Sequence, residues 1–326
     1  MDPWFRVAFL IAILLFIYMI FHFYWMIQLR YNPNLFSLYT PDNFYIDPSH
    51  KRAFQQRVKT GSQIAKNSSI IIASLVRDVE HNIRHLMSKV EQIGAHFRDY
   101  RLLIVENDSQ DKTREKLLEW SRRNNRVIVL GCGYNAPVCK LNLPRTVGHS
   151  VDKSRISKMV YLRNIYIQEI QRNYSNFDYT FMWDLDIIGM TYLDGIFHSL
   201  AVMNEQPNVN VICANGVYRW PIGTIFYDTY AISENEDTFH IDTKAFHDIA
   251  KSLNFKYFLG EDPVDVESCF SGFAIYRNSS MINPRVFYDM TPDPFNVECE
   301  HARFNKKIPG IKLVNPSMIN LVLVNT

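Results

Sequence analysis

Two aspartates, Asp184 and Asp186, stand one residue apart where an apolar, aromatic-rich run that begins at Tyr179 comes to an end. Successive side chains of a β-strand point to opposite faces of the sheet, so both carboxylates are expected on one face. Like charges there repel each other unless a cation lies between them, and Mg²⁺ and Mn²⁺ prefer carboxylate oxygens as ligands. The spacing predicts a divalent-metal site, although two solvated aspartates in a turn would produce the same pattern.

A guanidinium within an apolar stripe is the second chemically informative feature. Apolar residues recur at intervals of three and four over residues 154–172, which predicts a helix, and Arg163 lies in the middle of its apolar face. Burial of a guanidinium is costly unless it is paired, and its planar fork suits carboxylate or phosphate oxygens. Arg163 is therefore expected either to form a structural salt bridge or to approach a diphosphate.

Polar side chains also follow two short apolar runs, at residues 69–75 and 101–105. In open α/β sheets, ligands bind outside the carboxyl ends of the strands, so these side chains are candidates for binding a nucleotide. Turn formation and helix capping would use the same residue types. The candidates are Ser74, Arg77, Glu106, Asn107 and Asp108.

The segment Glu298-Cys-Glu-His301 adds a carboxylate and an imidazole near the carboxyl end. His301 could complete the metal shell, and Glu300 could orient an acceptor hydroxyl, although an isolated histidine more often has a structural role. An enzyme that uses a nucleotide sugar needs a pocket for base and ribose, a divalent cation and a positive group beside the leaving diphosphate. The candidate residues would meet all three needs.

The elements that must position these residues alternate along the chain. Apolar runs at 69–75, 101–105 and 127–130 predict strands, and helical spacing at 80–97 and after Asp111 predicts the helices between them. This order implies right-handed crossovers and a parallel sheet. From Val209 onward the pattern becomes irregular, with short strands expected at 211–214 and 273–276, so a second half that builds the acceptor side is plausible.

Charge and cysteine content exclude some classes of protein. Thirty-five Lys and Arg nearly balance 33 Asp and Glu, and no basic stripe appears, so we expect no nucleic-acid partner. The five cysteines have no C-x-x-C spacing, which argues against a zinc ribbon. Cys132 and Cys139 are the disulfide pair to test, and buried free thiols are an equal alternative. Glycosylation sequons at Asn67, Asn173 and Asn278 are compatible with a lumenal protein.

The amino terminus is apolar. No Asp, Glu, Lys or Arg occurs from Val7 to Ile27, and at about 1.5 Å per residue this run matches a bilayer core of roughly 30 Å. We expect an uncleaved membrane anchor with its short tail at residues 1–29, a polar, proline-containing stem at 30–66 and the folded body at 67–326. Basic residues on both sides leave the orientation undecided.

Four segments resemble a known family. They are VENDSQDKT (105–113), YLRN (161–164), MWDLD (182–186) and IFYDTYAI (225–232). On these the chain resembles glycosyltransferases of the GT-A fold, and in detail it is similar to the fungal capsule-associated α-1,3-mannosyltransferase family.

The resemblance implies an α/β fold with a Rossmann-like open mixed sheet, in a single catalytic domain behind an N-terminal transmembrane helix. Residues 67–190 would form the nucleotide-sugar half and 191–326 the acceptor half. Catalytic roles would fall to Asp184, Asp186, Asp228 and Glu300, and metal ligation to Asp184, Asp186 and His301. Donor binding would involve Arg163 and Asn164 besides the strand-end candidates, which are Ser74, Arg77, Glu106, Asn107 and Asp108.

The resemblance also implies a reaction. It would be a metal-dependent transfer of a sugar to a glycan acceptor, with Mn²⁺ or Mg²⁺ and a nucleotide-sugar donor, GDP-mannose being favoured and a UDP-sugar possible. Retention and an α-linkage would follow, in a single-pass type II protein with its catalytic domain in the lumen of the Golgi or endoplasmic reticulum. An inverting enzyme would instead need a carboxylate base, for which Asp262, Asp265 and Glu267 are candidates.

Two other classes compete with this interpretation. A nucleotidyltransferase would carry a glycine-rich, basic loop directly after its first strand, which IIIASLVRDVE lacks. A membrane-tethered, inactive glycan-binding relative would have lost a metal carboxylate or the strand-end acid, and both are present. Pocket shape in the irregular second half determines the sugar, the acceptor and the linkage, so the sequence leaves these open, together with the oligomeric state.

Overall fold

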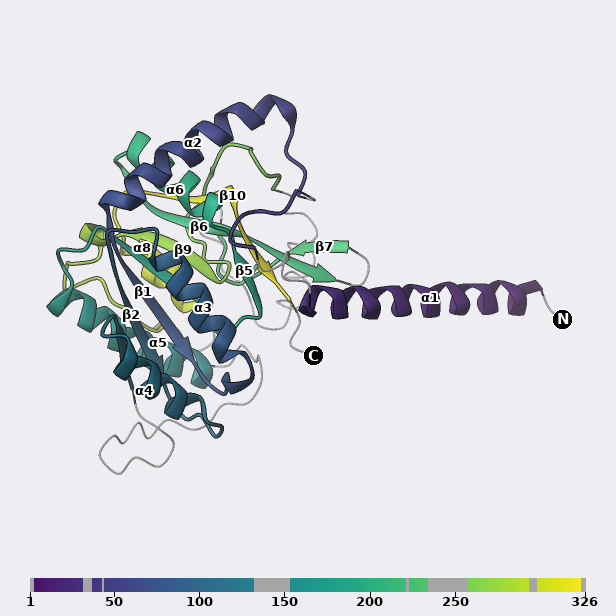
Figure 1. Cartoon of the computed structure of the whole chain (residues 1–326), viewed down its shortest axis with the longest axis horizontal. Coiled ribbons are helices and arrows are strands. Elements are labelled where there is room, and N and C mark those ends of the chain that lie inside the picture. Colours follow the sequence, from purple (N-terminus) through teal and green to yellow (C-terminus); the bar gives the residue numbers. More distant parts are fainter. Residues whose placement is uncertain are drawn as a thin grey trace.

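The computed structural model describes residues 3–31, 37–42, 44–131, 153–220, 223–233, 257–292 and 298–323. Within these ranges ten strands form one open mixed sheet with helices on both faces (Figure 1). The strands are β1 (Ser69–Val76), β2 (Asp99–Glu106), β3 (Val127–Leu130), β4 (Tyr179–Trp183), β5 (Gly189–Thr191), β6 (Val209–Trp220), β7 (Gly223–Phe226), β8 (Val264–Asp265), β9 (Phe273–Arg277) and β10 (Ile311–Val322).

The strand order is β3-β2-β1-β4-β9-β6-β10-β5, with β7 paired to β6 and β8 to β10. The first four strands are mutually parallel, β9 is antiparallel to both β4 and β6, and β10 runs parallel to β6. The carboxyl ends of β1, β2 and β4 therefore meet at one edge, as the strand–helix order predicted. The prediction of a mixed α/β sheet is confirmed.

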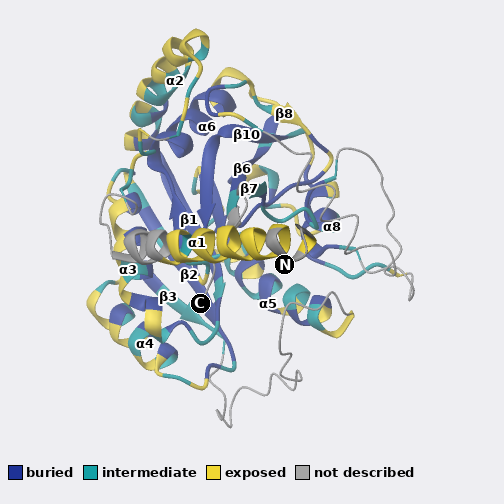
Figure 2. Cartoon of the chain, turned by 90° about the vertical axis from the view of Figure 1, so that its right-hand side faces the viewer, coloured by how far each residue is buried: buried dark blue, intermediate teal, exposed yellow. Residues whose placement is uncertain are grey.

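Seven α-helices accompany the sheet in the described ranges: α1 (Pro3–Tyr31), α2 (Pro48–Asn67), α3 (Ile83–Gly94), α4 (Thr113–Arg123), α5 (Lys153–Asn173), α6 (Leu193–Glu205) and α8 (Glu300–Lys306). Alternation along β1 explains why both faces are covered. Ile70 and Ile72 pack with α3, α4 and α6, whereas Ile71 and Ala73 pack with α5 and α8. Figure 2 shows the resulting buried sheet between its helices.

Helix α2 differs from the stem predicted over residues 30–66. It packs along α6 so closely that a Cβ on Gly61 would lie 1.7 Å from the carbonyl oxygen of Phe197. Arg57 of α2 also pairs with Glu205 of α6 at 3.1 Å. The glycine permits the two helices to approach closely where they cross. The pattern of polar residues in this segment does not reveal such a contact. The folded body thus includes α2 and begins before residue 67.

Helix α1 extends away from the body (Figure 1). Among the residues that the structure describes, no helix combines the length and the apolar character that a membrane crossing requires. The anchor predicted for residues 1–29 is therefore not supported.

A disulfide joins Cys213 of β6 to Cys269, in the segment that leads to β9. The predicted pair, Cys132 and Cys139, lies outside the described residues. Cys299 is a buried free thiol at the start of α8. The cross-link therefore fastens β6 to the segment that precedes its neighbour β9.

Candidate active site

A cavity of about 210 Å³ opens at the carboxyl ends of β1, β2 and β4, beside the first turns of α5. It brings apolar side chains together with cations, carboxylates and one amide. Arg77 and Asn107 come from the loops after β1 and β2, and Asp184 and Asp186 from the loop after β4. The other lining residues are Leu75, Val76, Val105, Arg155, Lys158, Met159, Leu162 and Arg163.

The loop after β4 places the two aspartates. The strand ends at Trp183, the Asp184 amide donates to the Gly272 carbonyl at 2.9 Å, and the Ile187 amide donates to the Asp184 carbonyl at 3.3 Å. The prediction that Asp184 and Asp186 share one face of a strand is therefore wrong in its geometry. Instead, a turn after β4 brings both carboxylates to the cavity. The short apolar run in the sequence is compatible with either a turn or a continuing strand at this point.

The carboxyl group of Asp184 lies in an acidic environment. Burial raises its pKa to about 7, with help from the charges of Asp186 and Glu300 and against the opposing Arg163 guanidinium. One Arg163 nitrogen lies 3.6 Å from Asp184 Oδ1. A divalent cation bound here would relieve the repulsion between the carboxylates that raises this pKa. The carboxylate oxygens of Asp184 and Asp186 are therefore suitable ligands for such an ion.

His301 does not join this pair. In the described part of the chain, no group of three His, Cys, Asp or Glu side chains is arranged to hold a metal ion. The His301 ring stacks on Phe270 with centroids 3.7 Å apart, and Nδ1 lies 3.3 Å from the Tyr288 hydroxyl. Burial lowers its pKa well below the usual value, and Nε2 has no hydrogen-bond partner among the residues that the structure describes. The predicted three-residue shell is not assembled, because aromatic packing holds the imidazole.

Arg163 forms the salt bridge that its sequence position suggested, and its approach to a diphosphate stays a prediction. Its Nε donates to Glu300 Oε1 at 3.1 Å and its Nη1 to the Tyr166 hydroxyl at 3.1 Å. The guanidinium also lies 5.4 Å from the ring centroid of Phe270 and 5.8 Å from that of Tyr288. These contacts fix a structural salt bridge between α5 and α8, and the same side chain borders the cavity.

Two further cations from α5 were not predicted. Lys158 is 3% exposed and pairs with Asp108 of the loop after β2. Arg155 lies one helical turn earlier and also lines the cavity. Lys158 lies four residues before Leu162, and Arg155 lies three residues before Lys158. The helical period extended toward the amino terminus could therefore have found both. With Arg77, whose Nε lies 3.8 Å from Asp78, they make the cavity wall strongly basic.

Asn107 and Glu106, adjacent in sequence, have different roles. Asn107 lines the cavity, is 3% exposed, and finds no hydrogen-bond partner in the described structure for either polar atom of its amide. Glu106 is fully buried, accepts from the Ser109 amide at 3.0 Å and pairs with Arg114 at 2.8 Å. Asn107 is thus free to bind a ligand, whereas the Glu106 carboxylate holds the loop.

Ser74 and Asn164 support the site from outside the cavity. The Ser74 hydroxyl accepts from the Leu185 amide at 3.3 Å, which ties the end of β1 to the loop of the two aspartates. The Asn164 amide exchanges hydrogen bonds of 2.9 and 2.8 Å with the backbone of Tyr288. Their predicted contact with the donor remains a prediction.

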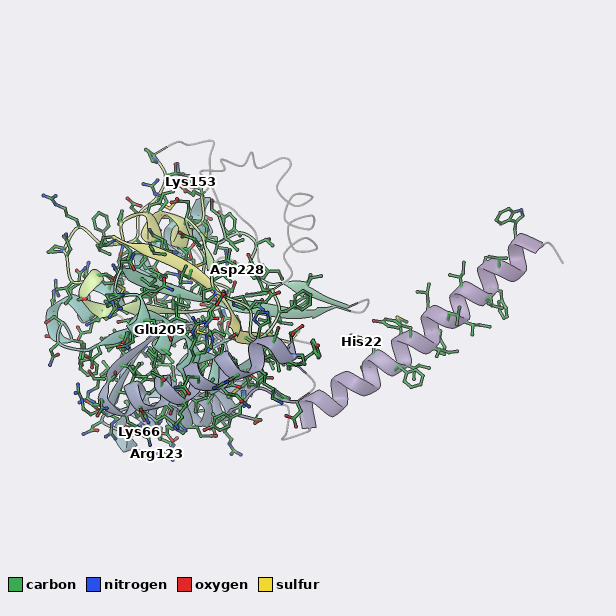
Figure 3. All side chains as sticks on the ribbon, turned by 90° about the horizontal axis from the view of Figure 1, so that it is seen from above. His22, Lys66, Arg123, Lys153, Glu205 and Asp228 are labelled. Atoms are coloured by element: carbon green, nitrogen blue, oxygen red, sulfur yellow. A yellow bond between two sulfur atoms is a disulfide. The ribbon has the colours of Figure 1, made fainter. Side chains whose placement is uncertain are left out.

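Asp228 follows β7 and joins the acidic group. Its backbone is left-handed, with φ 67°, and its Oδ2 accepts from the Ser271 amide at 3.0 Å. Burial, together with the charges of Asp184 and Glu300, raises its pKa to about 8. Figure 3 places Asp228 within the folded body, with Lys66 and Arg123 at its periphery.

Lys89 approaches the aspartate loop from the α3 face of the sheet. Its ammonium lies 4.8 Å above the Trp183 ring and the residue is 3% exposed. Burial lowers its pKa to about 8, and Asp186 opposes this change. No motif in the sequence indicates that the long side chain of Lys89 extends past a strand toward the aspartate loop.

The three carboxylates considered as bases for inversion do not line the cavity. Asp262 pairs with Arg57 of α2 at 3.3 Å, and Asp265 lies exposed on β8. The Glu267 amide donates to the Ser233 carbonyl at 2.8 Å. None of the three is therefore among the residues that border the cavity with Asp184.

Solved structures with limited similarity include the TarS fragment 1–349 of S. aureus with UDP-GlcNAc, at 12% identity and a TM-score of 0.45. The match covers 79% of this chain but only 59% of that one. PcManGT of Pyrobaculum calidifontis, with GDP-Man and Mn²⁺, matches at 9% identity and a TM-score of 0.42, covering 84% and 66%. GalNAc-T7 with UDP, GalNAc and Mn²⁺ matches at 10% and 0.45, covering 86% and 53%.

No curated protein sequence matches the chain significantly. A family model does match, and its description is cryptococcal mannosyltransferase 1. The match extends over residues 69–306, from the first residue of β1 to the last of α8, and so includes the whole cavity and both aspartates. The chain therefore belongs to the cryptococcal mannosyltransferase 1 family of glycosyltransferases.

Proposed function

We propose that this chain transfers mannose from a nucleoside diphosphate donor to a glycan acceptor, with a divalent cation held by Asp184 and Asp186. The observation that carries the proposal is the convergence, in one cavity, of an unpaired buried amide, two carboxylates and four cationic side chains. The amide suits a base or ribose, and the positive wall suits a diphosphate.

The protein's own cations match the charge that develops in the reaction. When the glycosidic bond breaks, the leaving diphosphate gains negative charge, which fixed positive groups stabilise without reorganisation. Arg163 is held in place by Glu300 and Tyr166, and Lys158 by Asp108. Their orientation is therefore set before the donor binds, which is how preorganised electrostatic stabilisation works.

Asp184 and Asp186 would supply two carboxylate ligands to Mn²⁺ or Mg²⁺, with the other positions left to phosphate oxygens and water. The cation would neutralise charge on the leaving diphosphate. Within the protein, the loop hydrogen bonds of Asp184 and the Ser74 contact to Leu185 hold both carboxylates at the cavity. An ion of this kind needs no third protein ligand, which agrees with the position of His301.

GDP-mannose, an α-linkage and retention of configuration complete the proposal. The family supports mannose. Retention is supported by the positions of Asp262, Asp265 and Glu267, none of which borders the cavity. In a front-face transfer the acceptor oxygen bonds to the sugar carbon as the carbon–oxygen bond to the diphosphate breaks, and the departing diphosphate takes the acceptor proton.

We further propose that the body works in the lumen of the Golgi or endoplasmic reticulum. The Cys213–Cys269 disulfide supports this location, because disulfides persist in oxidising compartments.

The test measures donor binding and slow donor hydrolysis by the full chain, using GDP-mannose, GDP-fucose and UDP-sugars with Mn²⁺ or with a chelator. We expect one donor to bind in a metal-dependent way, and Asp186→Asn to lose this binding at an unchanged melting temperature, because Asp186 is exposed. Asp265→Asn is the matched control, since it removes an exposed carboxylate far from the cavity. Absence of donor binding by the folded chain would overturn the proposal and favour an inactive glycan-binding relative.

A further inference from the structure

Tyr227, the residue after β7, is fastened between β6 and the turn that precedes β9. Its amide donates to the Gly216 carbonyl at 2.9 Å, and a Cβ on Gly216 would lie 2.9 Å from its own Cβ. A Cβ on Gly272 would lie 3.5 Å from its ring carbon Cε1. Gly216 therefore leaves room for the Tyr227 side chain, and the ring lies within ordinary contact distance of Gly272.

The turn at Ser271 and Gly272 links Tyr227 to the metal-binding loop. Both turn residues are left-handed, with φ of 57° and 75°. The Gly272 carbonyl accepts from the Asp184 amide at 2.9 Å, and the Ser271 hydroxyl donates to the Tyr227 carbonyl at 3.3 Å. Asn320 of β10 donates to the Ser271 carbonyl at 2.8 Å. Tyr227 and Asp184 are thus held on one rigid support.

The phenol of Tyr227 lies close enough to the charged groups of the site for their charges to affect it. Burial raises its pKa well above the usual value, as do the carboxylates of Asp228, Asp184 and Asp186, whereas Arg155 of the cavity wall opposes the shift. The hydroxyl therefore keeps its proton at neutral pH and can donate a hydrogen bond. Within the described ranges, no side chain or backbone group hydrogen-bonds to this hydroxyl.

The order of strands places Tyr227 on the other side of the two aspartates from Asn107. Asn107 follows β2, Arg77 follows β1 and the two aspartates follow β4. The sheet then continues through β9 to β6, beside which Tyr227 lies. Each step between strands is about 4.8 Å, so Asn107 and Tyr227 are on opposite sides of the aspartates, about two strands away in each direction.

A donor has the same linear order: base, ribose, diphosphate and sugar. We propose that the Tyr227 hydroxyl contacts the sugar of the nucleotide-sugar donor and helps to select it. This inference rests on the proposed function. If the diphosphate of the donor lies over Asp184 and Asp186 and its base lies toward Asn107, the sugar at the other end of the donor lies toward Tyr227. Tyr227 is then a specificity-determining residue that the sequence analysis did not name.

The experiment compares the binding of GDP-mannose with that of GDP, both with Mn²⁺, in the full-length wild-type protein and in Tyr227→Phe. The same comparison uses a UDP-sugar and UDP if the donor screen selects that pair. Loss of one hydrogen bond to the sugar should weaken binding of the nucleotide sugar by about three- to tenfold and leave binding of the free diphosphate unchanged. Tyr45→Phe is the matched control, because Tyr45 is 71% exposed and remote from the cavity.

Each outcome separates the inference from the function on which it rests. Equal GDP-mannose affinity in Tyr227→Phe and wild type would overturn the sugar contact while leaving donor binding established. Equal weakening of GDP-mannose and GDP would also overturn it, since the residue would then support the diphosphate site. If the wild-type protein binds neither ligand, the proposed function fails and the inference with it.

Discussion

Arg163 and Glu300 are 137 residues apart in sequence, and they join helices α5 and α8 through a hydrogen bond of 3.1 Å from Nε to Oε1. Both side chains are almost fully buried, and the other side of the guanidinium faces Asp184. The same cation therefore balances a structural carboxylate of α8 and a carboxylate of the proposed metal site. A substitution there should affect stability and donor binding together.

We expect Arg163→Gln to lower the free energy of unfolding by about 3–5 kcal/mol, because it leaves Glu300 buried without a counter-charge. Donor affinity should fall by about ten- to hundredfold, the effect of losing a charged hydrogen-bond donor. Glu300→Gln should cost less stability, since Arg163 keeps Asp184 as a partner. Chemical denaturation and titration calorimetry measure both effects, and unchanged donor affinity in a folded Arg163→Gln protein would leave only the structural role.

Metal binding should depend on pH because the pKa of Asp184 is about 7 in the metal-free protein. Because the pKa of Asp184 is raised in the folded protein, its protonated carboxyl group stabilises the metal-free fold at low pH. This stabilisation is lost as the pH rises through about 7. A metal ion needs the carboxylate, so Mn²⁺ affinity should fall by up to about tenfold for each pH unit below 7. Titrations at pH 6 and pH 8 measure this, and equal affinities would contradict the prediction.

Asn107→Ala should separate binding from stability. The substitution removes two buried polar atoms that have no partner, so the free energy of unfolding should stay the same or rise by about 1 kcal/mol. Nucleoside diphosphate affinity should fall. The matched control is Asn124→Ala, because the Asn124 amide donates to Glu91 and Tyr100 and lies outside the cavity. Asn124→Ala should lose stability and keep its nucleoside diphosphate affinity. Retained affinity in Asn107→Ala with reduced affinity in Asn124→Ala would refute the role of Asn107.

Glycosylation should distinguish the three sequons if the body is lumenal. Asn278 is fully buried, and its amide donates to the Tyr174 carbonyl at 2.8 Å and accepts from Thr180 at 3.0 Å. Asn67 and Asn173 are exposed. After expression in a eukaryotic secretory pathway, peptide mass spectrometry should find glycans at one or both exposed asparagines and none at Asn278. A glycan at Asn278 would contradict the described packing.

Some of the site could be predicted from sequence because it follows local periodicity. The stripe that contains Arg163 appears as expected on α5, and strand-end residues such as Asn107 do border the cavity. Other features depend on contacts between distant segments. Glu106 is turned inward by Arg114, and His301 is held by Phe270, neither of which a residue pattern encodes. Helix α2 escaped prediction because its partner, α6, lies far along the chain.

Strand β10 comes after every other described strand in the chain, yet it lies inside the sheet between β6 and β5. During synthesis, β1 to β4 and their helices can pair with one another as they emerge, whereas β6 must wait for residues 311–322 before its other edge is covered. Contacts of such long sequence separation slow folding and leave a sheet edge open to other chains. The part of the sheet around β6 is therefore the part whose folding depends most on the synthesis of residues 311–322.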